Sequence, residues 1–150
     1  MVVPVEHFSM GDHLYNMMTS PVCKKYDLTH MEFTVLIFLA NNPKYDRASD
    51  IIRVRRLTKS HVSMSVRSLE EKGFVACHHE KNDRRTVHLS LTKLALPIIN
   101  DGRSAQEKFF KELFTGFTDE EKAKLDEFML RIDKNIKSGI IRAEEDINGR

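Results

Sequence analysis

The chain has 150 residues, the usual size of one domain, and its 41% apolar and 31% charged residues, with only 6 Gly and 4 Pro, exclude a disordered or fibrous protein. Its formal charge of +2 is unevenly distributed: residues 47–93 carry 11 Lys/Arg and 5 Asp/Glu, or +6, and the other residues carry 13 and 17, or −4. A basic centre of this kind is typical either of a surface that binds a polyanion or of a solvated charged face.

The first helix is expected over about residues 1–20. Pro21 should end it, because proline has no amide hydrogen to donate and restricts the residue before it. The apolar side chains of this helix fall loosely on one face and are Val5, Phe8, Leu14, Met17 and Met18.

A second helix is better marked. Thr29 followed by Glu32 forms a capping box, in which a hydroxyl and a carboxylate bind amide donors left free at a helix start. Residues 33–39 are apolar on nearly every side, so we expect this helix in the centre of the core. The breaker cluster at residues 41–43 should end it.

Residues 48–72 show two short helical patterns separated by a turn at residues 55–57, with Thr58 as the expected N-cap of the second and Gly73 as its stop. A strand over residues 74–77, a turn over 80–84 and a second strand over 85–91 follow. Two helices joined by a turn and followed by a hairpin have the order of a winged helix.

Another helix is expected over about residues 92–114. Pro97 should make it start late or bend, and Gly102 is a second weak point.

The last helix begins at a second capping box, Thr118 with Glu121. An apolar stripe behind it continues for about six turns, longer than a small domain can cover, so we expect this helix, helped by the N-terminal one, to form a dimer interface. Residues 144–150 are expected to fray. The expected interface residues are Leu125, Phe128, Met129, Ile132 and Ile136.

Several segments together show a recognisable pattern: residues 48–52, 57–58, 62–75, 82–85, 89–92 and 117–121. They include a Leu-Glu-x-Lys-Gly helix end and an Asp-x-Arg hairpin turn. In this pattern, over nearly its whole length, the chain resembles the MarR family of bacterial winged-helix transcriptional regulators.

The resemblance implies a mainly α fold and a single domain over residues 1–150. In it, a winged helix-turn-helix lobe with a two- or three-stranded wing, about residues 29–93, is combined with dimerisation helices at about 1–20 and 94–145. It also implies a homodimer on a palindromic operator, with two recognition helices in successive major grooves and two wings along minor grooves. Most such proteins are repressors, released by a small molecule or an oxidant.

Two departures from the family pattern matter. Residues 93–97 stand where many members carry a glycine, which affects the connection between the dimer helices and the DNA-binding lobe. Met64 replaces an arginine often found there, so base preference cannot be transferred from relatives.

One helix face suits a major groove. If Val62, Val66 and Leu69 point inward, the opposite side offers small hydroxyls that can approach base edges, cations for phosphate or guanine, and a methionine for a thymine methyl. An ordinary solvated helix face has the same composition. The candidate DNA-binding residues on this side are Lys59, Ser60, His61, Ser63, Met64 and Arg67.

The hairpin turn adds a second candidate contact. Asp83 is expected to pair with an arginine and stiffen the hairpin, while Arg84 or Arg85 extends toward the minor groove. The alternative is a charged surface turn. Arg55, with the neighbouring Arg53 and Arg56, is expected to meet backbone phosphates.

Other chemistry is not expected. The sequence has no glycine-rich phosphate loop, nucleophile elbow or His-Glu-x-x-His motif, so we expect neither an enzyme nor a cofactor. The seven histidines lack metal-ligand spacing, and Cys23 and Cys77 lie outside any Cys-x-x-Cys motif, which excludes a disulfide scaffold and a cysteine-rich zinc site. No apolar run reaches the roughly 20 residues of a membrane span, and no secretory signal is visible, so we expect a cytoplasmic protein.

The sequence therefore predicts a DNA-binding homodimer whose partners are double-stranded DNA, a second copy and a small, aromatic effector. That effector is expected between the bend at Pro97 and the core helix at residues 33–39. One alternative is a redox sensor, because Cys23 lies near Tyr15 and Tyr26 in sequence, as in the peroxide-sensing branch of the same family; a buried, inert Cys23 is the opposing interpretation. Another is a winged-helix interaction module that does not bind DNA.

Overall fold

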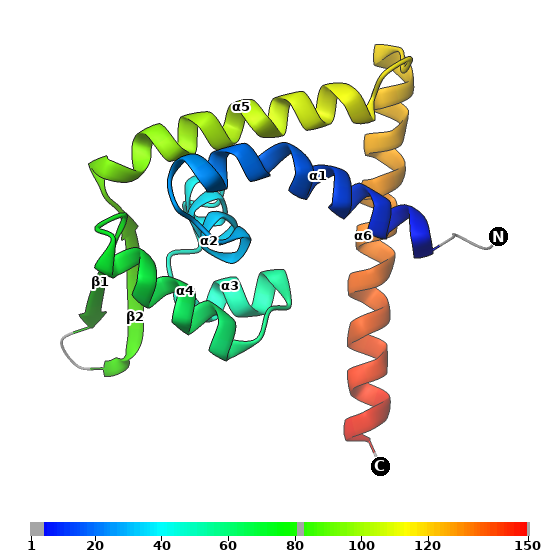
Figure 1. The fold of residues 1–150 in the computed structure, drawn as a ribbon. Helices are drawn as coiled ribbons and strands as arrows, with labels where there is room; N and C mark the ends of the chain where they lie inside the picture. Colours follow the sequence, from blue (N-terminus) through cyan, green and yellow to red (C-terminus); the bar gives the residue numbers. More distant parts are fainter. Residues whose placement is uncertain (1–4, 81–82, 150) are drawn as a thin grey trace. The chain divides into compact units, whose positions relative to one another are not determined.

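The computed structural model describes residues 5–80 and 83–149 and divides into two compact units, Met1–Phe110 and Lys111–Arg150. The fold is mainly helical with one two-stranded antiparallel sheet, as predicted (Figure 1). The single domain over residues 1–150 stays a prediction. The elements are α1 (Val5–Lys25), α2 (His30–Asn41), α3 (Ala48–Arg55), α4 (Lys59–Glu71), β1 (Val75–Glu80), β2 (Asp83–Leu91), a 3₁₀ turn (Lys93–Ala95), α5 (Leu96–Leu113) and α6 (Asp119–Asn148).

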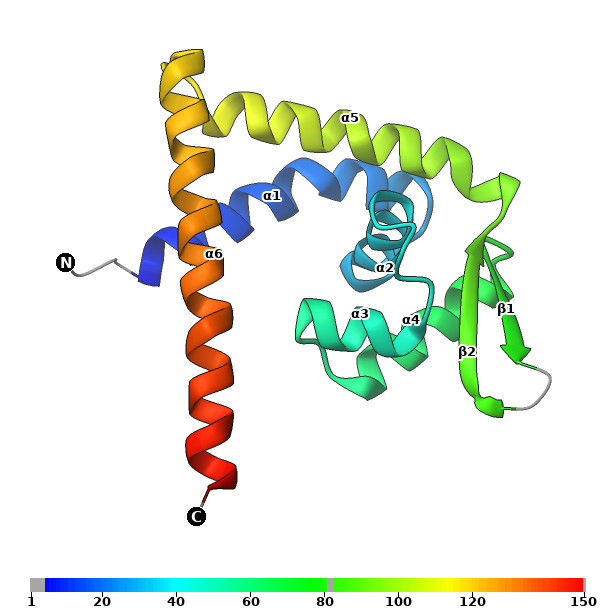
Figure 2. The ribbon, with the colours of Figure 1, turned by 180° about the vertical axis from the view of Figure 1, so that it is seen from behind.

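α2 lies in the middle of the first unit, with α1 and α5 on one side and α3 and α4 on the other, as both views show (Figures 1 and 2). Its capping box is confirmed: the Glu32 amide donates to Oγ1 of Thr29 over 3.1 Å, and the Thr29 amide donates to Glu32 over 2.7 Å. Phe33 and Leu36 are fully buried. The predicted central helix is therefore correct.

α1 does not end before Pro21, and that prediction was wrong. The helix continues through the proline to Lys25. Val22 and Cys23, in its last turn, are buried in the core. Their packing offsets the backbone hydrogen bond that proline cannot make.

The helix-turn-helix and the hairpin are confirmed. Arg56 ends α3 with a left-handed backbone (φ 52°), and Gly73 follows α4 with φ +76°, which glycine adopts without strain. β1 pairs antiparallel with β2 from Val75 opposite Leu91 to Glu80 opposite Asp83. The turn is shorter than the predicted residues 80–84 because this ladder continues into it.

α5 starts at Leu96, so Pro97 lies in its first turn, where a missing amide hydrogen costs nothing; the predicted late start is confirmed. Gly102 is not a weak point. A Cβ there would lie 2.7 Å from Cδ1 of Ile37 and 2.8 Å from Cε2 of Phe33. The glycine therefore allows α5 to approach α2 closely.

In the second unit, α6 begins at the predicted capping box. The Glu121 amide donates to Oγ1 of Thr118 over 3.2 Å, and the Thr118 amide donates to Glu121 over 2.8 Å. The predicted fraying of residues 144–150 was wrong as far as Asn148, because helical bonds continue to the Gly149 amide, which donates to the Glu145 carbonyl. Among the described residues, no helix is both long and apolar enough to cross a membrane.

Candidate nucleic-acid interface

The exposed face of α4 consists of the residues that the helical period predicts. Val62, Val66 and Leu69 are buried against the rest of the first unit, with Ser65 beside them. The opposite side faces solvent, and Met64 is 70% exposed there. We call this side the α4 face; its exposed residues are Lys59, Ser60, His61, Ser63, Met64 and Arg67.

Few side-chain contacts occupy the α4 face. Nε of Arg67 lies 3.0 Å from Glu71, one turn later on the same helix. The Arg67 side chain is 82% exposed, and an ion pair in water is worth less than about 1 kcal/mol. Arg67 can therefore exchange Glu71 for a phosphate or a base at small cost.

The three arginines around the turn after α3 lie in different surroundings. Arg53 pairs with Asp50 at 2.9 Å and lies over the ring of Tyr45. Arg56 is exposed. Arg55 is exposed and also lines a pocket of about 130 Å³ with residues of α1, α2 and α5, so its contact with backbone phosphates stays a prediction.

The predicted wing contacts stay predictions. Asp83, Arg84 and Arg85 belong to β2, but their side chains lie outside the described residues.

The base of the wing carries a contact that the sequence analysis missed. Nδ1 of His88 lies 2.9 Å from a carboxylate oxygen of Asp46, the Leu89 amide donates to the Asp46 carbonyl over 2.6 Å, and Arg47 forms a β-bridge with His88. The hydrogen bond with His88 lowers the pKa of Asp46. The loop before α3 is thus bound to β2. No local sequence motif indicates this long-range contact between Asp46 and His88.

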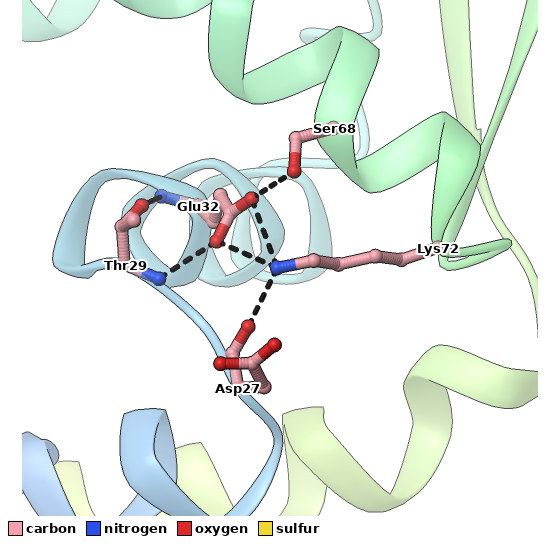
Figure 3. Close-up of polar contacts among 5 residues, drawn as sticks. All are labelled: Asp27, Thr29, Glu32, Ser68 and Lys72. Atoms are coloured by element: carbon pink, nitrogen blue, oxygen red, sulfur yellow. Dashed lines mark hydrogen bonds and ion pairs between the residues drawn. The ribbon is translucent and has the colours of Figure 1, made fainter.

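A second missed cluster lies at the C-terminal end of α4 (Figure 3). Glu32, 3% exposed, accepts a hydrogen bond from the hydroxyl of Ser68, and both of its oxygens lie 3.2 Å from Nζ of Lys72. Nζ of Lys72 also donates to the Asp27 carbonyl over 2.5 Å. The sequence marked Glu32 only as a capping residue, and no local motif pairs it with Lys72, the lysine of the Leu-Glu-x-Lys-Gly helix end.

Cys23 is buried, with Sγ 3.7 Å from Nδ1 of His30. Burial, joined by the nearby charge of Glu32, raises the pKa of the thiol. A neutral thiol is a poor nucleophile toward oxidants. No three His, Cys, Asp or Glu side chains among the residues that the structure describes are arranged to hold a metal ion.

Comparison with known proteins gives consistent results. The MarR family model matches residues 26–86, from the end of α1 into β2. The homoprotocatechuate degradative operon repressor of Escherichia coli is 27% identical over 129 residues, which are 86% of this chain and 84% of the repressor.

Two solved structures are similar over nearly the whole chain. The crystal structure of MarR has a TM-score of 0.76 at 19% identity and covers 95% of both chains. The Staphylococcus aureus MepR–DNA complex has a TM-score of 0.73 at 18% identity, with 90% of this chain and 99% of the other covered. Both likenesses confirm the mainly α, winged helix-turn-helix fold.

Proposed function

Because the MarR family model matches residues 26–86 and a relative over 86% of this chain is a repressor, we propose that the chain is a MarR-family transcriptional regulator, a cytoplasmic, sequence-specific DNA-binding protein that acts as a homodimer on a palindromic operator. The observation that carries this proposal is the α4 face, which presents hydroxyls, cations and one methionine on a helix whose other side is buried. In this proposal α4 enters the major groove, where each base pair has its own pattern of donors, acceptors and methyl groups. The basic charge of residues 47–93 supplies the attraction to phosphates.

Dimerisation is supported by the apolar stripe of α6. Its exposed apolar side chains need a second surface to cover them. With two-fold symmetry, two copies of α4 read half-sites about 34 Å apart, one helical turn of DNA. The predicted interface residues are all partly or largely exposed in this chain: Leu125, Phe128, Met129, Ile132 and Ile136.

Repression released by a small molecule is the finer part of the proposal. The pocket of about 130 Å³ combines the rings of Tyr15 and Phe38 with Ile37, Gln106 and Arg55. An engineered cavity of about 150 Å³ holds benzene, so this volume suits a one-ring aromatic ligand, and Arg55 suits an acidic substituent. The ligand would contact α2, the central helix of the first unit, as predicted, but it would meet α5 at Gln106 and not at Pro97.

The redox alternative receives less support, because the raised pKa of Cys23 disfavours the thiolate. Release by a one-ring aromatic acid should survive Cys23→Ser. Three results together would favour the redox sensor over the ligand-responsive repressor. Peroxide would release the wild type from DNA, Cys23→Ser would abolish that release, and aromatic acids would have no effect.

The test of DNA reading is a selection from random duplexes by the purified full chain, followed by binding to DNA upstream of its own gene. We expect enrichment of a palindrome whose half-sites lie about 10 base pairs apart. Binding that falls with salt but enriches no sequence would show attraction to DNA without sequence reading. Absence of DNA binding would favour the interaction module.

A further inference from the structure

The buried cluster of Glu32, Ser68 and Lys72 joins two segments with different tasks. Glu32 belongs to the first turn of α2, and the other two residues end α4, the proposed recognition helix. Figure 3 shows the carboxylate of Glu32 between the Ser68 hydroxyl, the Thr29 amide and the Lys72 ammonium. The cluster is therefore a directional contact between the core and the recognition helix.

The charges and hydrogen bonds of the cluster restrict the orientation of its groups more than they stabilise the fold. Burial acts to raise the pKa of Glu32, but hydrogen bonds from Ser68 and Thr29 and the ammonium of Lys72 outweigh it and hold this pKa below its ordinary value. Glu32 is thus an anion at neutral pH. A buried ion pair adds little net stability compared with apolar packing, because both charges lose water, but its hydrogen bonds restrict the angles of the groups that they join.

The α2 side of the contact is a fixed support. Phe33 and Leu36 are fully buried, and α5 presses on α2 at Gly102, where even a methyl group would collide with Ile37 and Phe33. Interiors packed this densely do not deform gradually. Seven residues of α2 are buried but only four of α4, whose other side faces solvent, so we expect a change in the cluster to move α4 more than α2.

The cluster lies at the C-terminal end of α4, whereas most residues of the α4 face lie toward the N-terminal end. Ser60 lies about 12 Å from Ser68 along the axis, at about 1.5 Å of rise per residue. A tilt of about 10° around Ser68 would move Ser60 by about 2 Å, which exceeds the tolerance of a hydrogen bond to a base. At the N-terminal end of α4, the Thr58 side chain makes no capping hydrogen bond. The apolar contacts of Val62 and Val66 do not fix the helix angle either, because hydrophobic contacts are non-directional.

We propose that the Glu32–Lys72 ion pair is a positioning element that sets the angle at which α4 meets DNA, so that discrimination between DNA sequences depends on the negative charge of Glu32. This inference rests on the proposed function, because it needs α4 to read bases. Glu32 itself is buried and acts only through Ser68 and Lys72.

The test uses substitutions that keep the shape of the cluster. Glu32→Gln removes the charge but keeps the capping box, since Gln serves equally at that position. Lys72→Arg keeps the cation. Glu121→Gln is the matched control, because Glu121 has the same place in the capping box of α6, where its partner is Thr118. For each full-length variant, the dissociation constant is measured for the duplex that the wild type selects and for a scrambled duplex, well below the thermal midpoint.

We expect Glu32→Gln to bind the scrambled duplex within about twofold of the wild type and to lose about fivefold or more in the ratio of the two dissociation constants. Lys72→Arg should keep most of the ratio, and Glu121→Gln all of it. A folded Glu32→Gln with a lower thermal midpoint but the wild-type ratio would overturn the proposal, because the pair would then serve folding alone.

If Glu32→Gln does not fold, Lys72→Gln decides instead, because it removes the cation of the ion pair and leaves Glu32 with its hydrogen bonds from Ser68 and Thr29. A smaller fall in the same ratio is expected, and an unchanged ratio overturns the proposal. A wild type that selects no sequence would overturn the proposed function, and this inference with it; a selective wild type with an equally selective Glu32→Gln would overturn this inference only.

Discussion

α2 and α6 both begin at a Thr-x-x-Glu capping box, yet seven residues of α2 are buried and none of α6 is. In α2 the apolar residues surround the helix, so the first unit closes around it. In α6 they form a stripe that this chain leaves exposed. A capping box thus fixes where a helix begins, whereas the distribution of apolar residues decides how much of the helix its own chain buries.

The largest expected effect on stability comes from truncating one phenylalanine in each of the two helices. Phe33→Ala, in α2, should lower the free energy of unfolding by about 3–5 kcal/mol at any protein concentration, because it empties a fully buried site. Phe128→Ala, in α6, should have an effect in urea denaturation that depends on protein concentration, since Phe128 is 45% exposed in the single chain. Equal, concentration-independent losses would contradict the contrast.

Charge on the α6 stripe should have the next largest effect. Phe128→Glu combined with Ile132→Glu should shift the protein to monomer, since a hot-spot residue of an interface contributes about 2 kcal/mol or more. Sedimentation at micromolar concentration should give twice 17.4 kDa for the wild type. A wild-type monomer would remove the two-fold symmetry on which the operator prediction depends.

Removing the threonine hydroxyl from each capping box should have a smaller effect on stability, and the two costs should differ. Thr29→Ala should cost about 1–2 kcal/mol, because the lost hydroxyl accepts from the amide of the buried Glu32. Thr118→Ala should cost about 0.5 kcal/mol, because the corresponding Glu121 is exposed to water. Thermal unfolding of both variants measures the difference. A larger cost at Thr118 would mean that α6 is the more tightly packed helix.

The smallest expected effect is a dependence on pH. The pKa of Glu32 is lower in the folded chain than its ordinary value, so its contribution to stability is complete above that ordinary value and is lost as the pH falls through the folded pKa. Stability of the wild type should therefore fall more steeply below about pH 5 than that of Glu32→Gln. Parallel curves would contradict the lowered pKa, because they require that Glu32 has the same pKa in the folded and the unfolded chain.

Much of the fold follows from local patterns, because caps, breakers and apolar periods act over a few residues. The bounds of α2 and the start of α6 are of this kind, as is the exposed side of α4. α1 continues beyond Pro21 because its last turn is buried. The sequence did not predict this, because burial depends on residues that are distant along the chain. Gly102 was misinterpreted for the same reason: a glycine within a helix weakens it unless a second helix needs the space.

The candidate site divides in the same way. The α4 face follows from a period of 3.6 residues, whereas the contact of Glu32 with Lys72 and that of Asp46 with His88 join residues about 40 positions apart. No short motif encodes such pairs.

The claim that the α4 face reads DNA sequence is tested most directly by Arg67→Ala. Its binding to the selected duplex and to a scrambled duplex is compared with that of the wild type, and Lys122→Ala on α6, which loses the same charge from another exposed ion pair, is the control. A good base contact provides about 1–3 kcal/mol of discrimination, so the ratio of the two affinities should fall by about tenfold for Arg67→Ala and stay unchanged for Lys122→Ala. Equal losses on both duplexes would contradict the account, because Arg67 would then contact phosphate alone.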